Sequence, residues 1–403
     1  MKGPCARSLR QAGGLAFIVL LWGGGCESVL PRASVAPDVL LSRRAADDAE
    51  EAAQNERLIN ALVSHAKTKV DEAATRPSTQ PATVDVLIIS GGGDWGAFGA
   101  GVLKGWQNAR GDGALPQFDA VTGVSTGALI APFAFLGDPQ SIERINTLYR
   151  NPKSDWALKR GLLFFWPNNE SLFELPGLER ALEKEVDAPM LERIARESAR
   201  GRLLLLNSSN LDFGEMRAWD LGAAAHYSAE NQDGEFARKI MLASSAIPGA
   251  FPARVVSGSL YADGGVTGNI LYGARLTNAA SFWARWQNAY PTTPVPRLRY
   301  WLILNNQFRF PPEIIQRRWP DVMSRAMAMA TQSATVNGIR HLFTIAQLAE
   351  LRYGTKVEVR VMAIPEEWRP PASGVFKKET MNALADLGER MGADPTSWLR
   401  EPP

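Results

Sequence analysis

The chain has 403 residues, 45% of them hydrophobic and 21% charged, so it can form one large domain or two ordinary ones with a substantial core. Its formal net charge of +2 excludes a strong basic field, and we expect no nucleic-acid partner. The only two cysteines, Cys5 and Cys26, precede the globular part, which excludes a disulfide framework or a cysteine-based metal site there.

The first 25 residues are arranged like a secretion signal. Basic residues precede an apolar run at 15–22, which is too short to span a membrane, and three glycines lead to Cys26. The small residues before Cys26 resemble a bacterial lipobox, although Gly23 replaces the usual aliphatic residue. We therefore expect lipidation at Cys26 and an outer-membrane lipoprotein of the bacterial cell envelope. A secreted protein cut near the glycines is the alternative.

Residues 26–82 have the composition of a stalk, rich in alanine, acidic residues, serine, threonine and proline. Within them, Asp47–Lys69 is a possible amphipathic helix, with Leu58, Leu62 and Val63 on one face. Arg76–Pro81 is typical of a linker. The sequence thus predicts a stalk between a membrane anchor and a domain.

A domain at 84–365 follows, in which apolar runs alternate with helical patterns. Strands are expected at Val86–Ile89, Phe118–Thr122, Leu203–Leu206, Trp301–Leu304 and Val357–Ala363. Helices are expected at Gly96–Ala109, Thr126–Phe135, Ile240–Ala246 and Val322–Leu348. This alternation predicts an α/β fold with a mostly parallel central sheet flanked by helices. Residues 366–403 are expected to form a C-terminal tail with a short helix.

A glycine-rich loop follows the first strand. Gly91, Gly93 and Gly96 match the G-x-G-x-x-G pattern of dinucleotide-binding folds. Such folds place an acidic residue about 20 positions later for the ribose, but neither Asp112 nor Asp119 fits that role. The loop is better interpreted as backbone amides that face the oxygen of another substrate.

The second strand leads into a candidate nucleophile. Gly123, Ser125 and Gly127 match G-x-S-x-G between a strand and a helix, which is the context of a nucleophile elbow. Flanking glycines remove side chains from a sharp turn, and the helix N-terminus favours developing negative charge beside the serine.

A serine nucleophile needs a base, and the histidines are poorly placed to supply one. His65 lies in the stalk, His226 in a polar loop, and His341 within a long helix. In contrast, Asp263 follows a short strand and precedes Gly264 and Gly265, which places a carboxylate on an open, tight turn.

Together these motifs resemble the patatin-like phospholipases. A fourth block, Ala243–Pro252, is similar to the family's A-S-x-A-x-P-x-x-F-P segment, and the resemblance runs from about Val84 to about Asn269. It implies a three-layer α/β sandwich and a lipid acyl hydrolase without metal or cofactor. It also implies a dyad of Ser125 and Asp263, with an oxyanion hole at Gly91, Gly92 and Gly93. The resemblance implies a lipid or ester substrate as partner, and the N-terminal sequence adds the membrane surface, reached through the lipid anchor at Cys26.

Some observations leave alternatives open. Trp95 stands where the family often has a basic residue, which places phospholipid preference in question. Ser244 and Ser245 lack flanking glycines and are interpreted as the end of a helix near the acyl pocket. The alternatives are an α/β-hydrolase triad that adds His341, a non-catalytic lipid-binding lipoprotein and, more distantly, a nucleotide-binding oxidoreductase.

Overall fold

The computed structural model describes residues 32–75, 82–161, 169–273 and 281–403. The expected secretion signal, Cys26 and the linker at 76–81 lie outside these ranges.

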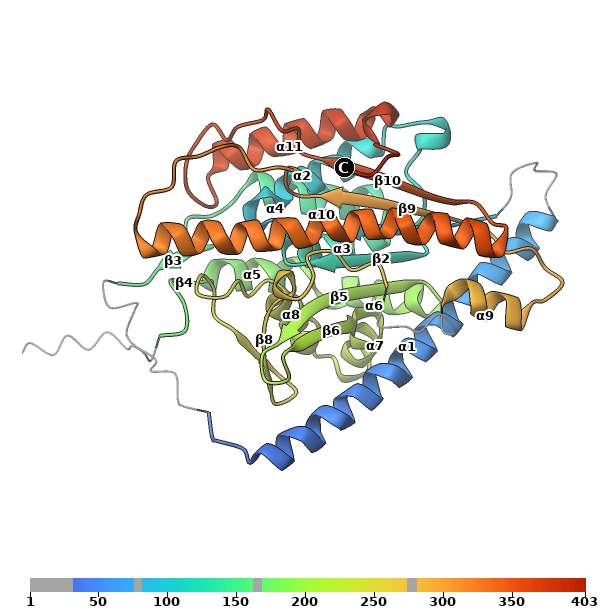
Figure 1. Ribbon diagram of the computed structural model, residues 1–403, viewed down its shortest axis with the longest axis horizontal. Helices are drawn as coiled ribbons and strands as arrows, with labels where there is room; N and C mark the ends of the chain where they lie inside the picture. Colours follow the sequence, from blue (N-terminus) through green and yellow to red (C-terminus); the bar gives the residue numbers. More distant parts are fainter. Residues whose placement is uncertain (1–31, 76–81, 162–168, 274–280) are drawn as a thin grey trace, which may run out of the picture.

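A mostly parallel sheet forms the centre of the molecule (Figure 1). Its strands are β1 (Thr83–Ile89), β2 (Ala120–Val124), β5 (Leu203–Asn210), β6 (Glu215–Asp220), β7 (Arg254–Val256), β8 (Ser259–Asp263), β9 (Arg297–Leu304) and β10 (Val357–Ala363). Their order is β10-β9-β1-β2-β5-β8-β7, with β6 also paired to β5. The first five of these are parallel, whereas β6, β7 and β8 pair antiparallel. The predicted α/β class is therefore confirmed.

Helices cover both faces of this sheet. They are α1 (Pro37–Ala74), α2 (Gly96–Trp106), α3 (Thr126–Leu136), α4 (Pro139–Arg150), α5 (Pro176–Glu185), α6 (Ala188–Ala199), α7 (Leu221–Asn231), α8 (Glu235–Ser244), α9 (Phe282–Ala289), α10 (Trp319–Tyr353) and α11 (Lys378–Ala393). A short hairpin pairs β3 (Leu158–Lys159) with β4 (Phe173–Glu174).

The alternation of side chains along β1 separates two cores. Leu87 and Ile89 pack with α2, α3 and α11, whereas Val86 and Ile88 pack with α1, α9 and α10. Both faces of the strand are buried, which explains its unbroken apolar run. We call these the α2 face and the α10 face of the sheet.

The helix expected in the stalk belongs to the domain instead. α1 is longer than the predicted Asp47–Lys69, and its second half packs on the α10 face. Its buried apolar residues are Leu58, Ile59, Leu62, Val63 and Ala66. The apolar stripe that predicted the helix thus also attaches it to the sheet, so this part of the chain is not a detached stalk.

The C-terminal segment is also an integral part of the fold. α11 packs against α2 so closely that a Cβ at Gly388 or Gly392 would lie 2.2 Å from the carbonyl oxygen of Phe98 or Val102. Across the same contact, a Cβ at Gly105 would lie 1.9 Å from the Glu389 carbonyl oxygen. The segment expected to be a tail therefore contains a helix that packs against α2 by direct backbone contact.

Among the described residues, we find no helix with the length and apolar character that crossing a membrane requires.

Candidate active site

Ser125 lies at a strained turn between β2 and α3. Its φ is +53°, an unusual value for a residue other than glycine. A Cβ at Gly123 would lie 2.4 Å from the Gly127 carbonyl oxygen, and one at Gly127 would lie 2.2 Å from the Ile89 carbonyl oxygen. Only glycines fit at both flanks, as the predicted nucleophile elbow requires.

Two serines of the Ala243–Pro252 block hold the backbone of this turn. The Ser125 amide donates to Ser244 Oγ at 3.0 Å, and the Ser244 hydroxyl donates to the Asn207 carbonyl at 2.6 Å. The Ser245 hydroxyl donates to the Ser125 carbonyl at 3.1 Å. Ser244 and Ser245 therefore position the candidate nucleophile, a role that the sequence did not reveal.

The strand register explains why Asp263 meets Ser125. On β5, Asn207 pairs with Val124 of β2, and the next residue, Ser208, pairs with Asp263 of β8. Because β6 occupies the other edge of β5, β2 and β8 follow one another along the same edge. The end of β2 and the end of β8 thus bring the serine and the aspartate together.

The Asp263 carboxyl group is buried, with 5% of the residue exposed. Its Oδ1 accepts a hydrogen bond from the Gly265 amide at 2.7 Å. Burial raises the pKa of Asp263 to about 6, and the nearby Ser125 hydroxyl and the Gly265 amide partly oppose this rise. Within the described chain, Oδ2 has no hydrogen bond of ordinary geometry, so it is free to accept a proton.

The glycine loop borders the same serine. A Cβ at Gly91 would lie 3.0 Å from the Ser125 Cβ. However, the Gly91 amide already donates to the Asn269 carbonyl at 3.3 Å, which argues against Gly91 as an oxyanion donor. The amides of Gly92 and Gly93 have no hydrogen-bond partner among the described residues. The loop therefore offers two free donors rather than the expected three.

Asn269 is a polar neighbour of the site that was not predicted. Its side-chain oxygen would lie 2.3 Å from a Cβ at Gly91 and 3.3 Å from one at Gly265. It thus lies between the glycine loop and the Asp263 turn. The signal that could have identified it is a single amide next to the apolar pair Ile270 and Leu271.

The remaining motif glycines permit close packing. A Cβ at Gly96 would lie 2.0 Å from Thr126 Oγ1, and one at Gly264 would lie 2.4 Å from the Asn207 carbonyl oxygen. These contacts bring the start of α2 against the start of α3, and the Asp263 turn against β5.

The segment before α11 supports the glycine loop. The Phe376 amide donates to Asp94 Oδ2 at 2.9 Å, and burial raises the pKa of Asp94. Trp95 packs edge to face against Trp368, with ring centroids 5.2 Å apart. Trp95 therefore anchors the loop by aromatic packing at the position where the family often has a basic residue.

The family of this chain follows from a match that spans the site. Residues 87–274 match the family model described as patatin-like phospholipase. This chain carries a patatin-like phospholipase domain. No curated protein matches the chain. Among solved structures, VipD from Legionella pneumophila is similar with 12% identity and a TM-score of 0.35, over 77% of this chain and 66% of the VipD chain.

No histidine of the described chain contacts the acid of this patatin-like site. His341 Nδ1 lies 2.9 Å from the Tyr272 hydroxyl, and His65 Nε2 lies 2.8 Å from Asp119. His226 is exposed on α7, a helix where a polar loop was expected. These contacts do not assemble the alternative triad with His341.

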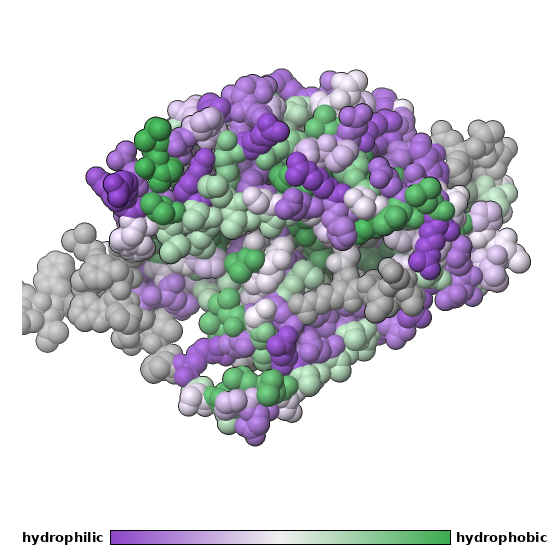
Figure 2. All heavy atoms as spheres, viewed as in Figure 1, coloured by the Kyte–Doolittle hydropathy of each residue, from purple (hydrophilic) through white to green (hydrophobic). Residues whose placement is uncertain are grey.

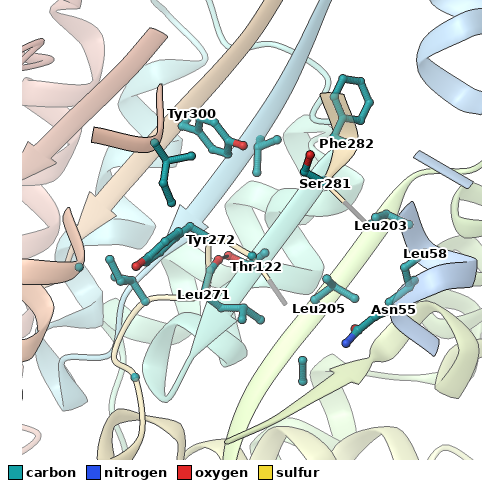
Figure 3. A pocket seen from close by; sticks show the side chains of 18 of the residues that line it. Asn55, Leu58, Thr122, Leu203, Leu205, Leu271, Tyr272, Ser281, Phe282 and Tyr300 are labelled. Carbon is teal, nitrogen blue, oxygen red and sulfur yellow. Dashed lines mark hydrogen bonds between the residues drawn. The ribbon is translucent and has the colours of Figure 1, made fainter. Parts of the chain in front are cut away.

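A cavity of about 750 Å³ lies on the α10 face of the patatin-like domain (Figure 3). Its walls are mainly hydrocarbon, with Leu58, Leu203 and Phe282 among them, and such walls suit an apolar chain. Neither Ser125 nor Asp263 lines it. The segment 267–273, which follows the Asp263 turn, forms one wall.

Proposed function

We propose that the protein is a lipid acyl hydrolase that cleaves carboxylic esters with a Ser125–Asp263 dyad. The observation that carries this proposal is the strained Ser125 beside a buried carboxyl group whose pKa is raised to about 6. A base with a pKa near the working pH can take up and return a proton within one cycle. The patatin-like family match supports a lipid ester as the substrate class.

In the proposed reaction, Ser125 Oγ attacks the ester carbonyl carbon while its proton passes to Asp263 Oδ2. The amides of Gly92 and Gly93 donate to the oxyanion of the tetrahedral intermediate. The intermediate collapses, and the leaving alcohol takes the proton from Asp263. Water then attacks the acyl-serine and gives its proton to Asp263, and collapse of the second intermediate releases the fatty acid and returns the proton to Ser125.

Three variants and one label test this proposal. A fluorophosphonate should modify Ser125, and Ser125→Ala should abolish both labelling and hydrolysis of a short-chain ester. Asp263→Asn should come close to that loss, because the amide keeps the shape and removes the base. His341→Ala should keep most of the activity, because its partner is Tyr272.

The result at His341 separates the two serine-hydrolase mechanisms. If His341→Ala is as inactive as Ser125→Ala while its circular dichroism is unchanged, the dyad is wrong and a triad operates. If fluorophosphonate modifies no serine of the folded protein, the non-catalytic lipid-binding alternative is favoured.

We also propose that the protein is an envelope lipoprotein anchored through Cys26, on the basis of its N-terminal sequence. In a Gram-negative host, Cys26→Ala should release the protein from membranes or leave it unprocessed. One acyl chain binds a membrane only marginally, so loss of a multiply acylated cysteine should have a large effect. Unchanged processing and partition in Cys26→Ala would contradict the anchor.

A further inference from the structure

The long helix α10 begins at the carboxyl ends of the parallel strands, which is also where Ser125 lies. α10 connects the end of β9 to the start of the parallel strand β10, so its first residue lies at the carboxyl ends of the strands. Its 35 residues span about 52 Å, whereas the eight residues of β9 span about 26 Å. The second half packs on the sheet, and the first turns extend past the sheet edge (Figure 1).

These first turns expose an apolar face. Every residue from Trp319 to Ala330 is exposed except the half-buried Arg325. At about 100° per residue, the large apolar side chains cover roughly 160° of the helix circumference. The large ones, exposed between 46% and 79%, are Trp319, Val322, Met323, Met327 and Met329.

On the polar side of these turns, Arg325 is the residue that faces the rest of the protein. Arg325 donates to the Pro311 carbonyl at 3.0 Å and lies over the Phe310 ring, 5.0 Å from its centroid. It also approaches Glu313 at 3.7 Å. Since the large apolar side chains of these turns are all exposed, the apolar face has no cover from the described chain. Figure 2 shows hydrophobic side chains on the surface at this end of the molecule.

The charge beside this face identifies its partner. Arg317 and Arg318 immediately precede the helix, are exposed, and have no ion-pair partner among the described residues. Exposed basic residues next to an apolar face with a tryptophan match the chemistry of an anionic bilayer surface. Asp321 is the one acid within the exposed turns and lies on their polar side.

We propose that the first turns of α10, Trp319–Ala330, dock the protein on an anionic lipid surface. Docking there would place the carboxyl ends of the strands, where Ser125 lies, next to the bilayer that contains the lipid ester. The purpose of the docking rests on the proposed hydrolase function, but binding itself does not depend on turnover.

Vesicle binding by the full chain tests the docking. The protein carries Cys26→Ala and Ser125→Ala, so that neither an attached lipid nor hydrolysis contributes. Its sedimentation with phosphatidylcholine vesicles is measured with and without phosphatidylglycerol. Met323→Glu with Met327→Glu should weaken binding at least tenfold, since each removes apolar contact and adds charge. Ser324→Glu, on the polar side of the same turns, is the matched control and should bind nearly as the parent does.

Further variants separate apolar from electrostatic contributions. Met323→Leu with Met327→Leu should restore binding, which a merely structural defect in the glutamate variant would not predict. Arg317→Ala with Arg318→Ala should weaken binding to phosphatidylglycerol vesicles severalfold and reduce its salt dependence.

Two results would overturn the proposal. One is equal vesicle binding by the parent and the Met323→Glu, Met327→Glu variant. The other is a parent dimer, seen by light scattering, that this variant converts to a monomer without a change in vesicle binding, because a second copy of the chain would then cover the face. Since binding is read without turnover, loss of the proposed esterase function would not produce either result.

Discussion

The two faces of the sheet are packed in different ways. On the α2 face, α2 and α11 touch backbone to backbone, and a single methyl group at Gly388 or Gly392 would overlap a carbonyl oxygen. On the α10 face, a cavity of about 750 Å³ lies among the strands, α1, α9 and α10. One sheet thus carries a close-packed layer and a loosely packed one.

The difference in packing between the two faces matches the part of the molecule that lies on each face. The glycine loop leads directly into α2, and α11 with the segment before it fixes both, through contacts such as Phe376 to Asp94. The proposed oxyanion donors must be held in place before the reaction, so a rigid layer suits them. An apolar chain needs volume and hydrocarbon walls rather than precise donors, and the α10 face provides these.

The contact between α2 and α11 should give the largest effect on stability. Gly388→Ala with Gly392→Ala should lower the free energy of unfolding by about 4 kcal/mol or more, because both methyl groups overlap carbonyl oxygens. The sign is informative, since alanine in a helix is ordinarily favoured over glycine by up to about 1 kcal/mol per residue. Urea unfolding followed by circular dichroism measures the change.

The matched control enlarges a side chain on the loosely packed α10 face. Ala120 is buried on β2 and lines the cavity, so Ala120→Val should change the free energy of unfolding by less than about 1 kcal/mol. Equal destabilisation by the two changes would show that the faces are packed alike, and the comparison would fail.

The sequence predicted those parts of the fold that depend on local pattern. The unbroken apolar run of β1 and the glycines around Ser125 were sufficient, because burial on both faces and a sharp turn each leave a local signature. The site assignments of Ser125 and Asp263 stay predictions until they are tested chemically.

Contacts between distant segments were beyond sequence reasoning. The hydroxyl of Ser244 holds the Ser125 amide only because β5 and α8 pack beside β2, and no local pattern encodes that. The spacing of four between Gly388 and Gly392 was a usable signal for close helix packing, but it lay in a segment interpreted as a tail. Likewise, α7 begins because the Asp220 side chain accepts a hydrogen bond from the Ala223 amide. This cap directly precedes the stretch around His226 that is interpreted from the sequence as a polar loop.

Asp263 should lower the stability of the folded protein as the pH rises from about 4 to about 6. Its pKa is raised to about 6 in the folded protein against about 4 when unfolded. Below about pH 4 the carboxyl is protonated in both states and contributes no difference. Above about pH 6 it is charged in both, and the folded state carries the burial cost, about 3 kcal/mol for two pKa units.

Asp263→Asn should therefore gain stability relative to the parent as the pH rises. The difference in free energy of unfolding between the two proteins should be larger by about 3 kcal/mol at about pH 8 than at about pH 4. For the parent, kcat/KM should rise with pH through about 6, because the base must be ionised. A stability difference independent of pH would contradict the raised pKa.

The smallest expected effect is a loss of kcat on displacing a proposed oxyanion donor. Gly93 is the position at which this loss can be measured separately from a packing defect. Gly92 cannot be used, because a Cβ there would lie 2.3 Å from the Asn305 carbonyl oxygen. Gly93 has no atom within 4 Å of its Cβ position and a φ of +60°, and Gly111 shares both properties with a φ of +69° in a loop before β2. Alanine should cost similar backbone strain at the two sites, about 1 kcal/mol each.

Of these two sites, only Gly93 carries a proposed oxyanion donor, so only there does the backbone strain of alanine displace such a donor. Gly93→Ala should therefore lower kcat for a short-chain ester by about tenfold to a hundredfold with little change in KM, because a displaced amide weakens the transition state more than the bound substrate. Gly111→Ala should lose comparable stability while it keeps its kcat. Equal kcat values for the two variants would mean that the Gly93 amide makes no contact with the oxyanion, and the rigid loop would then have a purely structural role.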